Sequence, residues 1–139
     1  MGTWLLATPK EIRQWGKNRQ TRTKDPRVER LCEKISGLGT FDVIVFEDVQ
    51  FSVYAQQTQL WSSLRAAIWL CGRSPIIEAV PVTTLKKFAT GSGAADKLAM
   101  ARCFLTNPYF RNSPKLDDNG IDAAWLWLWA FTNLSRTKT

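Results

Sequence analysis

Three acidic side chains have the types and spacing of a carboxylate metal site. Glu47 closes an apolar run at residues 43–49, and a second acidic group at residues 117–122 opens the last apolar run of the chain. Asp118 and Asp122 are four residues apart, so a helix that starts there places both on one face. If that face meets the end of the Glu47 strand, the three carboxylates converge as Mg²⁺ or Mn²⁺ requires. A metal held in this way activates water and stabilises an in-line attack on phosphate.

The same acids also have an ordinary structural interpretation. Carboxylates favour the first turn of a helix and are common at the ends of strands. Spacing alone therefore leaves two alternatives open, a metal site or plain surface chemistry, and other features of the chain must decide between them.

Composition indicates a folded basic protein. The chain has 139 residues, of which 45% are hydrophobic, and it contains seven tryptophans. This length suits one domain with a substantial core, which we expect to span residues 1–139. Nineteen Lys and Arg against twelve Asp and Glu give a net charge of +7. That balance favours nucleic acid as a partner, although a merely soluble basic protein would also show it.

Several classes of site are excluded by residue type. The chain has no histidine, so catalytic triads, metal sites and general bases built on histidine are all excluded. The cysteines are widely spaced and form no C-x-x-C pair, which predicts neither a zinc site nor a disulfide framework and fits a reducing cytoplasm. No run approaches ~20 apolar residues, so no membrane span is expected, and the first eight residues do not form a secretory signal.

Periodicity predicts alternating strands and helices. We expect Asp25 to cap a helix that begins at Pro26 and stops at Gly37 or Gly39, and Gly72 to close a later helix. The predicted strands are residues 2–8, 41–49 and 76–82; the other predicted helices are residues 56–71, 94–105 and 119–134; the predicted loops are residues 11–25 and 106–115. The nearly continuous apolar residues of 41–49 predict a buried strand. This alternation predicts an α/β fold.

Two further patterns each allow more than one interpretation. The run Gly91-Ser92-Gly93 precedes a helix and can either cradle a phosphate or form a plain loop with a helix start. It lacks the Walker A and dinucleotide-binding patterns. Trp125, Trp127 and Trp129 spread around a helix, so we expect them mostly in the core, with one at a dimer interface.

The order of these blocks resembles the RuvC-like Holliday junction resolvases, especially their phage and prophage relatives. The resemblance covers residues 41–130, and its motifs are residues 43–49, 80–87, 89–97 and 117–123. It implies an RNase H-like mixed sheet flanked by helices. It also implies a Mg²⁺- or Mn²⁺-dependent endonuclease that acts as a homodimer on Holliday junctions or other branched DNA, in a prokaryotic or phage-infected cell.

The resemblance assigns the metal ligands by position. Glu47 matches the second metal-binding acid of the family and Asp122 the last one. Asp118 matches the remaining acid in the phage-type pattern. Cellular resolvases place that acid where this chain has Asn119, so the third ligand position falls on one of these two neighbours.

The resemblance also assigns contacts to DNA. Lys97 resembles the basic residue that stabilises the phosphate at the cut, and Lys86 matches a second family lysine by its separation from Lys97. Aromatic residues in this region of related resolvases wedge into a junction, although plain packing is an equal alternative here. The further residues expected to contact DNA are Lys87, Ser92, Phe51 and Tyr54.

One departure from the family pattern concerns the first strand. The family opens with a strand that carries an Asp before a Gly-Thr pair, whereas the first residues here, Met1 to Trp4, resemble the second strand. We therefore expect the first strand and its Asp to be missing, which would remove a metal ligand. The alternative function that follows is a non-catalytic branched-DNA-binding remnant of a resolvase.

Overall fold

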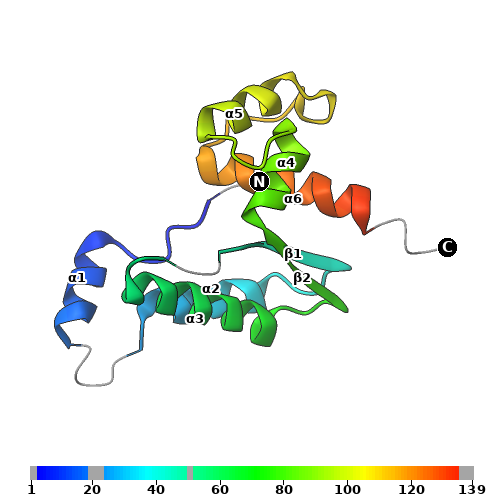
Figure 1. The fold of residues 1–139 in the computed structure, drawn as a ribbon. Helices are drawn as coiled ribbons and strands as arrows, with labels where there is room; N and C mark the ends of the chain where they lie inside the picture. The colour runs from blue at the N-terminus through cyan, green and yellow to red at the C-terminus, as the bar shows by residue number, and fades with distance from the viewer. Residues whose placement is uncertain (1–2, 19–23, 50–51, 135–139) are drawn as a thin grey trace. The chain divides into compact units, whose positions relative to one another are not determined.

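The computed structural model describes residues 3–18, 24–49 and 52–134 and forms a mixed α/β fold (Figure 1). In chain order its elements are α1 (Pro9–Asn18), α2 (Pro26–Gly37), β1 (Val43–Asp48), α3 (Ala55–Cys71), β2 (Ile76–Pro81), α4 (Val82–Thr90), α5 (Lys97–Thr106), the short 3₁₀ helix η2 (Pro108–Phe110) and α6 (Asp118–Asn133). The predicted α/β class is confirmed. Among these described residues no helix is long and apolar enough to cross a membrane.

The sheet of the described residues pairs β1 with β2. A parallel bridge between Thr40 and Arg73 precedes the two strands, and the same offset separates their first residues, Val43 and Ile76. The strands therefore run parallel, with α3 as the crossover connection that parallel pairing requires. The antiparallel strands of a mixed RNase H-like sheet are not among the described residues, so that part of the expected fold stays a prediction.

The chain divides into two compact units, and each strand of the sheet begins in one and ends in the other. The α4–α6 unit comprises Thr3, residues 45–49 and residues 78–134 of the described chain. The α1–α3 unit comprises residues 4–18, 24–44 and 52–77. The prediction of one domain over residues 1–139 is not decided by this division.

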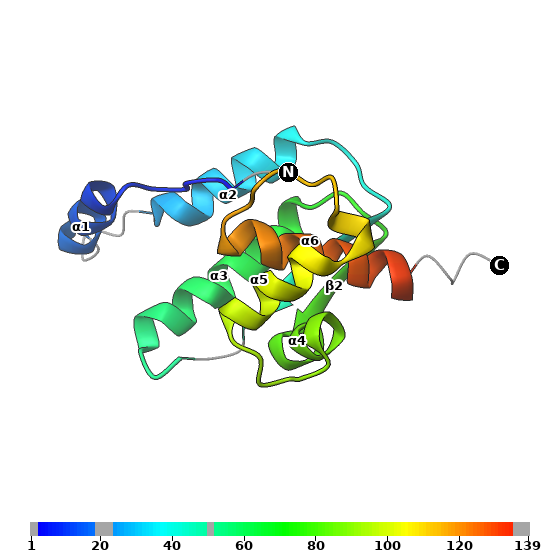
Figure 2. The same cartoon turned by 90° about the horizontal axis from the view of Figure 1, so that it is seen from above.

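The core of the α4–α6 unit is built around Trp125. This side chain is 2% exposed, and its indole Nε1 donates a hydrogen bond to the carbonyl of Met100 at 3.3 Å. Phe110 meets the Trp125 ring edge-on at a centroid distance of 5.2 Å and stacks on Phe104 at 4.7 Å. Both views show α5 lying alongside α6 (Figure 1, Figure 2). These contacts hold the starts of α5 and α6 in fixed positions.

The three tryptophans of α6 have different surroundings. Trp125 belongs to the core, as predicted, and Trp129 packs against it while remaining partly buried. Trp127 is 51% exposed and stacks on Phe131 at a centroid distance of 5.6 Å. A helix places residues two apart on different sides, which is why only some of the three can reach the core.

The α1–α3 unit rests on the packing of α2 against α3, which run side by side (Figure 1). Gly72 ends α3 because a larger residue does not fit there: an added Cβ would lie 2.6 Å from the Ile68 carbonyl oxygen and 2.9 Å from Ile44 Cδ1. Ala67 is 3% exposed in this interface. Leu70, near the end of the same helix, is 84% exposed and does not contribute to this packing.

Two predictions at the start of the chain are also wrong. Residues 3–8, the described part of the predicted strand 2–8, form no strand, and the predicted loop at residues 11–25 contains α1. The overlooked signal is a capping box: Thr8 Oγ1 accepts from the Glu11 amide at 3.2 Å, and Glu11 Oε2 accepts from the Thr8 amide at 2.7 Å. Pro9 at the first helical position adds a preorganised φ angle.

Candidate functional site

Glu47 is placed by β1 in the α4–α6 unit. All six residues of β1 are half-buried, so the prediction of a fully buried strand was wrong. The reason lies in the sheet, since β1 pairs only with β2 among the described residues. Glu47 is therefore partly shielded from water while remaining accessible to a ligand.

The start of α6 places the other two acids. Asp117 is the N-cap residue, and its Oδ1 accepts a hydrogen bond from the Gly120 amide at 2.7 Å. An added Cβ at Gly120 would lie 3.1 Å from that same oxygen, so a larger residue here would require the Asp117 side chain to shift. Asp118 is the first residue of α6 and Asp122 follows one turn later, so both lie on one face as predicted. Asp118 is exposed and Asp122 is half-buried.

Glu47 and Asp122 interact electrostatically. Burial raises the pKa of Glu47, the charge of Asp122 raises it further, and Lys86 and Lys97 oppose both effects. Burial also raises the pKa of Asp122; Lys97 lowers it, and the charge of Asp118 raises it.

Two lysines face this acidic cluster. Lys97 is the first residue of α5, where Asp96 caps the helix by accepting from the Ala99 amide at 2.8 Å. The Lys97 Nζ lies 3.4 Å from Asp118 Oδ2. Lys86 lies on α4, is half-buried, and lowers the pKa of Glu47 and Asp122 by its charge. The structure therefore brings together five of the residues that the sequence predicted for the site: Glu47, Asp118, Asp122, Lys86 and Lys97.

The expected cage of three carboxylates is not formed. Within the described ranges, no three His, Cys, Asp or Glu side chains gather closely enough to hold a metal ion. Asp118 pairs with Lys97, while Glu47 and Asp122 resist ionisation, which a cation between them would relieve. Mg²⁺ is commonly held by one or two carboxylates, with water and substrate phosphate as its remaining ligands. The pair Glu47 and Asp122 therefore fits Mg²⁺ by its chemistry, and the assignment of a third ligand stays a prediction.

The loop between α4 and α5 is largely satisfied by its own hydrogen bonds. Gly91 ends α4 with φ of 87°, and its amide donates to the Lys87 carbonyl at 2.8 Å. Ser92 donates its amide to Thr90 Oγ1 at 3.2 Å, and its own hydroxyl accepts from the Ala94 amide at 3.3 Å. These bonds favour a plain turn with a helix start over a phosphate cradle. The predicted DNA contacts of Lys87 and Ser92, which are both exposed, remain untested.

Of the two aromatic residues expected to wedge into a junction, the structure describes only Tyr54. Phe51 lies outside the described residues. Tyr54 belongs to the α1–α3 unit, where it precedes α3 as the N-cap residue and has a side chain that is 70% exposed. Its exposure is compatible with stacking on a base, and its role stays a prediction.

Sequence reasoning missed one residue that shapes the site. Thr3 Oγ1 donates a hydrogen bond to Asp117 Oδ1 at 2.9 Å. Together with the capping bond to Gly120, this contact occupies Asp117 and leaves Asp118 and Asp122 as the acids of the site. The cap pattern, an Asp directly before a helix, signals the role of Asp117, but no local signal points to Thr3, which lies 114 residues away along the chain.

Comparisons with known proteins support the fold. No protein-family model matches this chain, and no curated protein matches its sequence. Among solved structures, the chain is similar to Thermus thermophilus RuvC, with a TM-score of 0.52 and 14% sequence identity over 76% of this chain and 68% of that protein. At this identity the likeness defines the fold and not the activity. The chain therefore has a RuvC-like α/β fold, as its motif order predicted.

Proposed function

We propose that this protein is a metal-dependent, structure-selective endonuclease that cuts Holliday junctions or other branched DNA. The observation that carries the proposal is the meeting of Glu47, Asp122 and Lys97 in one unit of a RuvC-like fold. Paired acids and a facing cation are what phosphodiester hydrolysis needs. The net charge of +7 supports a polyanionic substrate.

The residues have separate roles in this proposal. Glu47 and Asp122 would hold Mg²⁺ or Mn²⁺, with Asp118 as the third ligand, and the bound metal would supply an activated water and stabilise charge on the phosphate. Lys97 places its ammonium group beside the acids, where it offsets the negative charge that develops on the scissile phosphate. Lys86 adds a second positive charge from α4.

The test is cleavage of a labelled four-way junction with Mg²⁺ or Mn²⁺, compared with a linear duplex of equal length. Wild type should cut the junction and spare the duplex. Glu47→Gln and Asp122→Asn should each lose about 10²-fold in rate, the scale of removing one preorganised charge-stabilising group. Asp42→Asn is the matched control, because Asp42 is exposed and lies outside the α4–α6 unit. Failure of wild type to cut with either metal would contradict the proposal.

A second candidate function is non-catalytic binding of branched DNA. It is favoured by the absence of a three-carboxylate group among the described residues. It predicts junction binding that weakens steeply with salt as condensed counterions are released, with no Mg²⁺-dependent cutting. Equal junction affinity across a tenfold range of salt would argue against this function, as would metal-dependent cleavage.

A further inference from the structure

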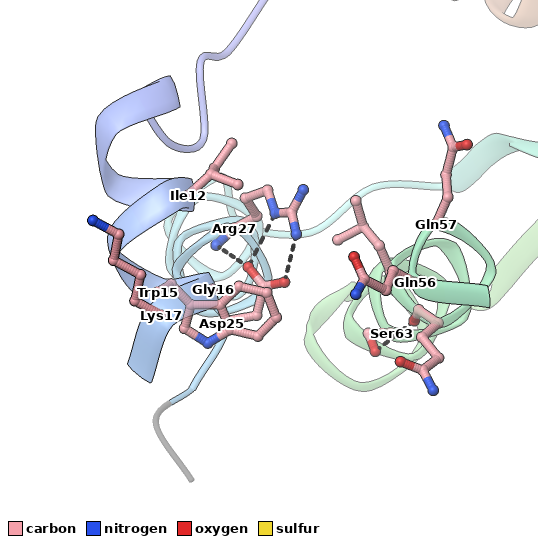
Figure 3. Close-up of a pocket in the computed structure, with 11 residues that line it drawn as sticks. Ile12, Trp15, Gly16, Lys17, Asp25, Arg27, Gln56, Gln57 and Ser63 are labelled. Carbon is pink, nitrogen blue, oxygen red and sulfur yellow. Dashed lines mark hydrogen bonds and ion pairs between the residues drawn. The ribbon is translucent and has the colours of Figure 1, made fainter. Parts of the chain in front are cut away.

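The α1–α3 unit contains a cavity that the acidic site does not use. Its volume is about 990 Å³, and it lies between α1 with the start of α2 on one side and α3 on the other. Ligand sites commonly occupy ~300–1,000 Å³, so the cavity can accept a sizeable organic group. Figure 3 shows Trp15, Asp25 and Arg27 facing Gln56 across it. The lining of the cavity includes Trp15, Lys17, Asp25, Arg27, Gln56 and Gln59.

One wall of the cavity is a preorganised planar surface. The Arg27 guanidinium carbon lies 5.8 Å from the centre of the Trp15 ring. Arg27 is held in place by Asp25, through Nε to Oδ1 at 3.1 Å and Nη2 to Oδ2 at 2.9 Å. Burial opposes ionisation of Asp25, but its hydrogen bonds with Arg27 keep the pKa of this carboxyl below its usual value. Asp25 is therefore matched by Arg27 and does not present an unbalanced negative charge to an incoming anion.

The opposite wall offers amide groups. Gln56 and Gln59 lie on α3, are exposed, and make no side-chain hydrogen bond within the described part of the chain. A glutamine amide both donates and accepts hydrogen bonds, which suits the edge of a nucleobase. These two side chains differ from Gln57, whose Oε1 already accepts from Ser52 at 3.0 Å.

A cationic surface borders the cavity. Lys10, Arg13 and Lys17 are spaced by three and four residues, so they share one exposed face of α1. Lys17 also lines the cavity. The acid of this helix, Glu11, is paired with Arg30 at 2.7 Å and does not cancel the charge of that face.

We propose that this cavity binds an unpaired nucleotide. The base stacks on the surface formed by Trp15 and Arg27, its edge meets the Gln56 and Gln59 amides, and its phosphate lies toward Lys17. Stacking platforms combined with cationic grooves are the usual means of holding single-stranded nucleic acid. The inference depends on the chemistry of the cavity and not on cleavage by the α4–α6 unit.

The test is binding of a labelled oligo-dT of about 12 nucleotides, within the common site size for such proteins, to the full chain in metal-free buffer. Trp15→Ala should weaken binding roughly 5- to 150-fold, the range measured for loss of one stacking partner. Trp69→Ala is the matched control, because Arg65 lies over the Trp69 ring at 5.7 Å in the same unit but outside the cavity. This control should change affinity by less than about twofold.

A second variant protects the test against misfolding of Trp15→Ala. Gln56→Ala combined with Gln59→Ala alters exposed side chains only, and we expect it to weaken binding about tenfold. Gln14→Ala, an exposed glutamine of α1 outside the cavity, is its control. Circular dichroism should show unchanged helix content in the glutamine variants.

Free dTMP, measured by equilibrium dialysis, distinguishes the two sources of a nucleotide. Loss of both oligo-dT and dTMP binding in the cavity variants supports a pocket that accepts free nucleotides. Loss of oligo-dT binding alone supports a pocket for a strand. Cavity variants that bind both ligands as wild type does would overturn the proposal. None of these outcomes depends on junction cleavage, so this proposal and the nuclease proposal can fail separately.

Discussion

The ammonium group of Lys97 lies 3.4 Å from Asp118 Oδ2, which joins the first residue of α5 to the first residue of α6. The two side chains are 76% and 59% exposed. Ion pairs of this exposure contribute ~0–1 kcal/mol to stability, because water screens them and ordering long side chains is costly. The contact therefore matters for the placement of charge beside Glu47 and Asp122 more than for holding the fold.

Asp118→Asn should consequently have a small effect on folding and a larger one on function. We expect the free energy of unfolding to change by less than about 0.5 kcal/mol. Junction cleavage should fall if Asp118 is a metal ligand. Chemical denaturation and the cleavage assay measure the two effects separately. A loss of several kcal/mol in stability would contradict the interpretation of this pair as a surface contact.

Neutralising the Glu47 carboxylate should stabilise the metal-free protein at neutral pH. Its folded-state pKa lies above the ordinary glutamate value of 4.5, so the folded state holds the Glu47 proton more tightly than the unfolded state does. The contribution of Glu47 to stability is therefore fully present below pH 4.5 and is lost as pH rises through its folded-state pKa. Glu47→Gln removes the free-energy cost of ionising a half-buried carboxyl. After allowance for solvent screening, the gain in the free energy of unfolding is at most about 1 kcal/mol, which corresponds to a rise in Tm at pH 7 of roughly 4 °C.

Asp42→Asn should leave the melting temperature at pH 7 unchanged, because Asp42 is exposed. A Glu47→Gln variant that is less stable than wild type at pH 7 would show that the carboxylate makes a favourable contact instead.

Divalent metal should reverse the repulsion between Glu47 and Asp122. Mn²⁺ at a hundredfold excess over its dissociation constant should stabilise the fold by about 2.7 kcal/mol. The gain should disappear in Asp122→Asn. Thermal denaturation with increasing Mn²⁺ measures this stabilisation. A wild-type melting temperature that does not change with Mn²⁺ would favour the non-catalytic function.

Acid should weaken the α1–α3 unit through Glu11. The side-chain hydrogen bond from Arg30, followed by the backbone hydrogen bond from Thr8, lowers the pKa of Glu11 from 4.5 to about 2. A lowered folded-state pKa gives stability that is present above pH 4.5 and is lost as pH falls toward about 2. Helix content followed by circular dichroism should decline over this window, and less so in Glu11→Gln. The control variant Glu33→Gln changes an exposed residue of α2, and its helix content should decline over the same pH range as that of wild type.

The glycine at the end of α3 should tolerate no side chain. Gly72→Ala forces a Cβ to within 2.6 Å of a backbone oxygen, so we expect a loss of at least ~2 kcal/mol. Gly37→Ala is the control, because an added Cβ there meets nothing within 4 Å. That control should be neutral or slightly stabilising, since alanine restricts the unfolded chain. Urea denaturation compares the two, and equal stability would show that the α3 terminus can relax.

Local chemistry was the predictable part of the fold. The Asp25 cap and Pro26 start of α2 were predicted because the capping bond spans only two residues along the chain. The predicted start of α5 lay three residues before Lys97, because the Asp96 cap was overlooked. Helix α1 was not predicted, because the capping box formed by Thr8 and Glu11 was not recognised. The strand predicted at residues 2–8 had suitable residue types, but tertiary context did not give it a partner among the described strands.

The sequence by itself determined the acids, the lysines and the order of elements that carries them. Only the tertiary structure decided which of these side chains interact. The charge of Asp122 raises the pKa of Glu47, whereas Asp118 forms an ion pair with Lys97. Residue types and helical spacing fix directions within a few turns of one element. The approach of groups far apart in the chain depends on how the core around Trp125 packs. Such long-range packing is cooperative and is not encoded in any single motif, which is why the pairing of these charges became visible only in the folded unit.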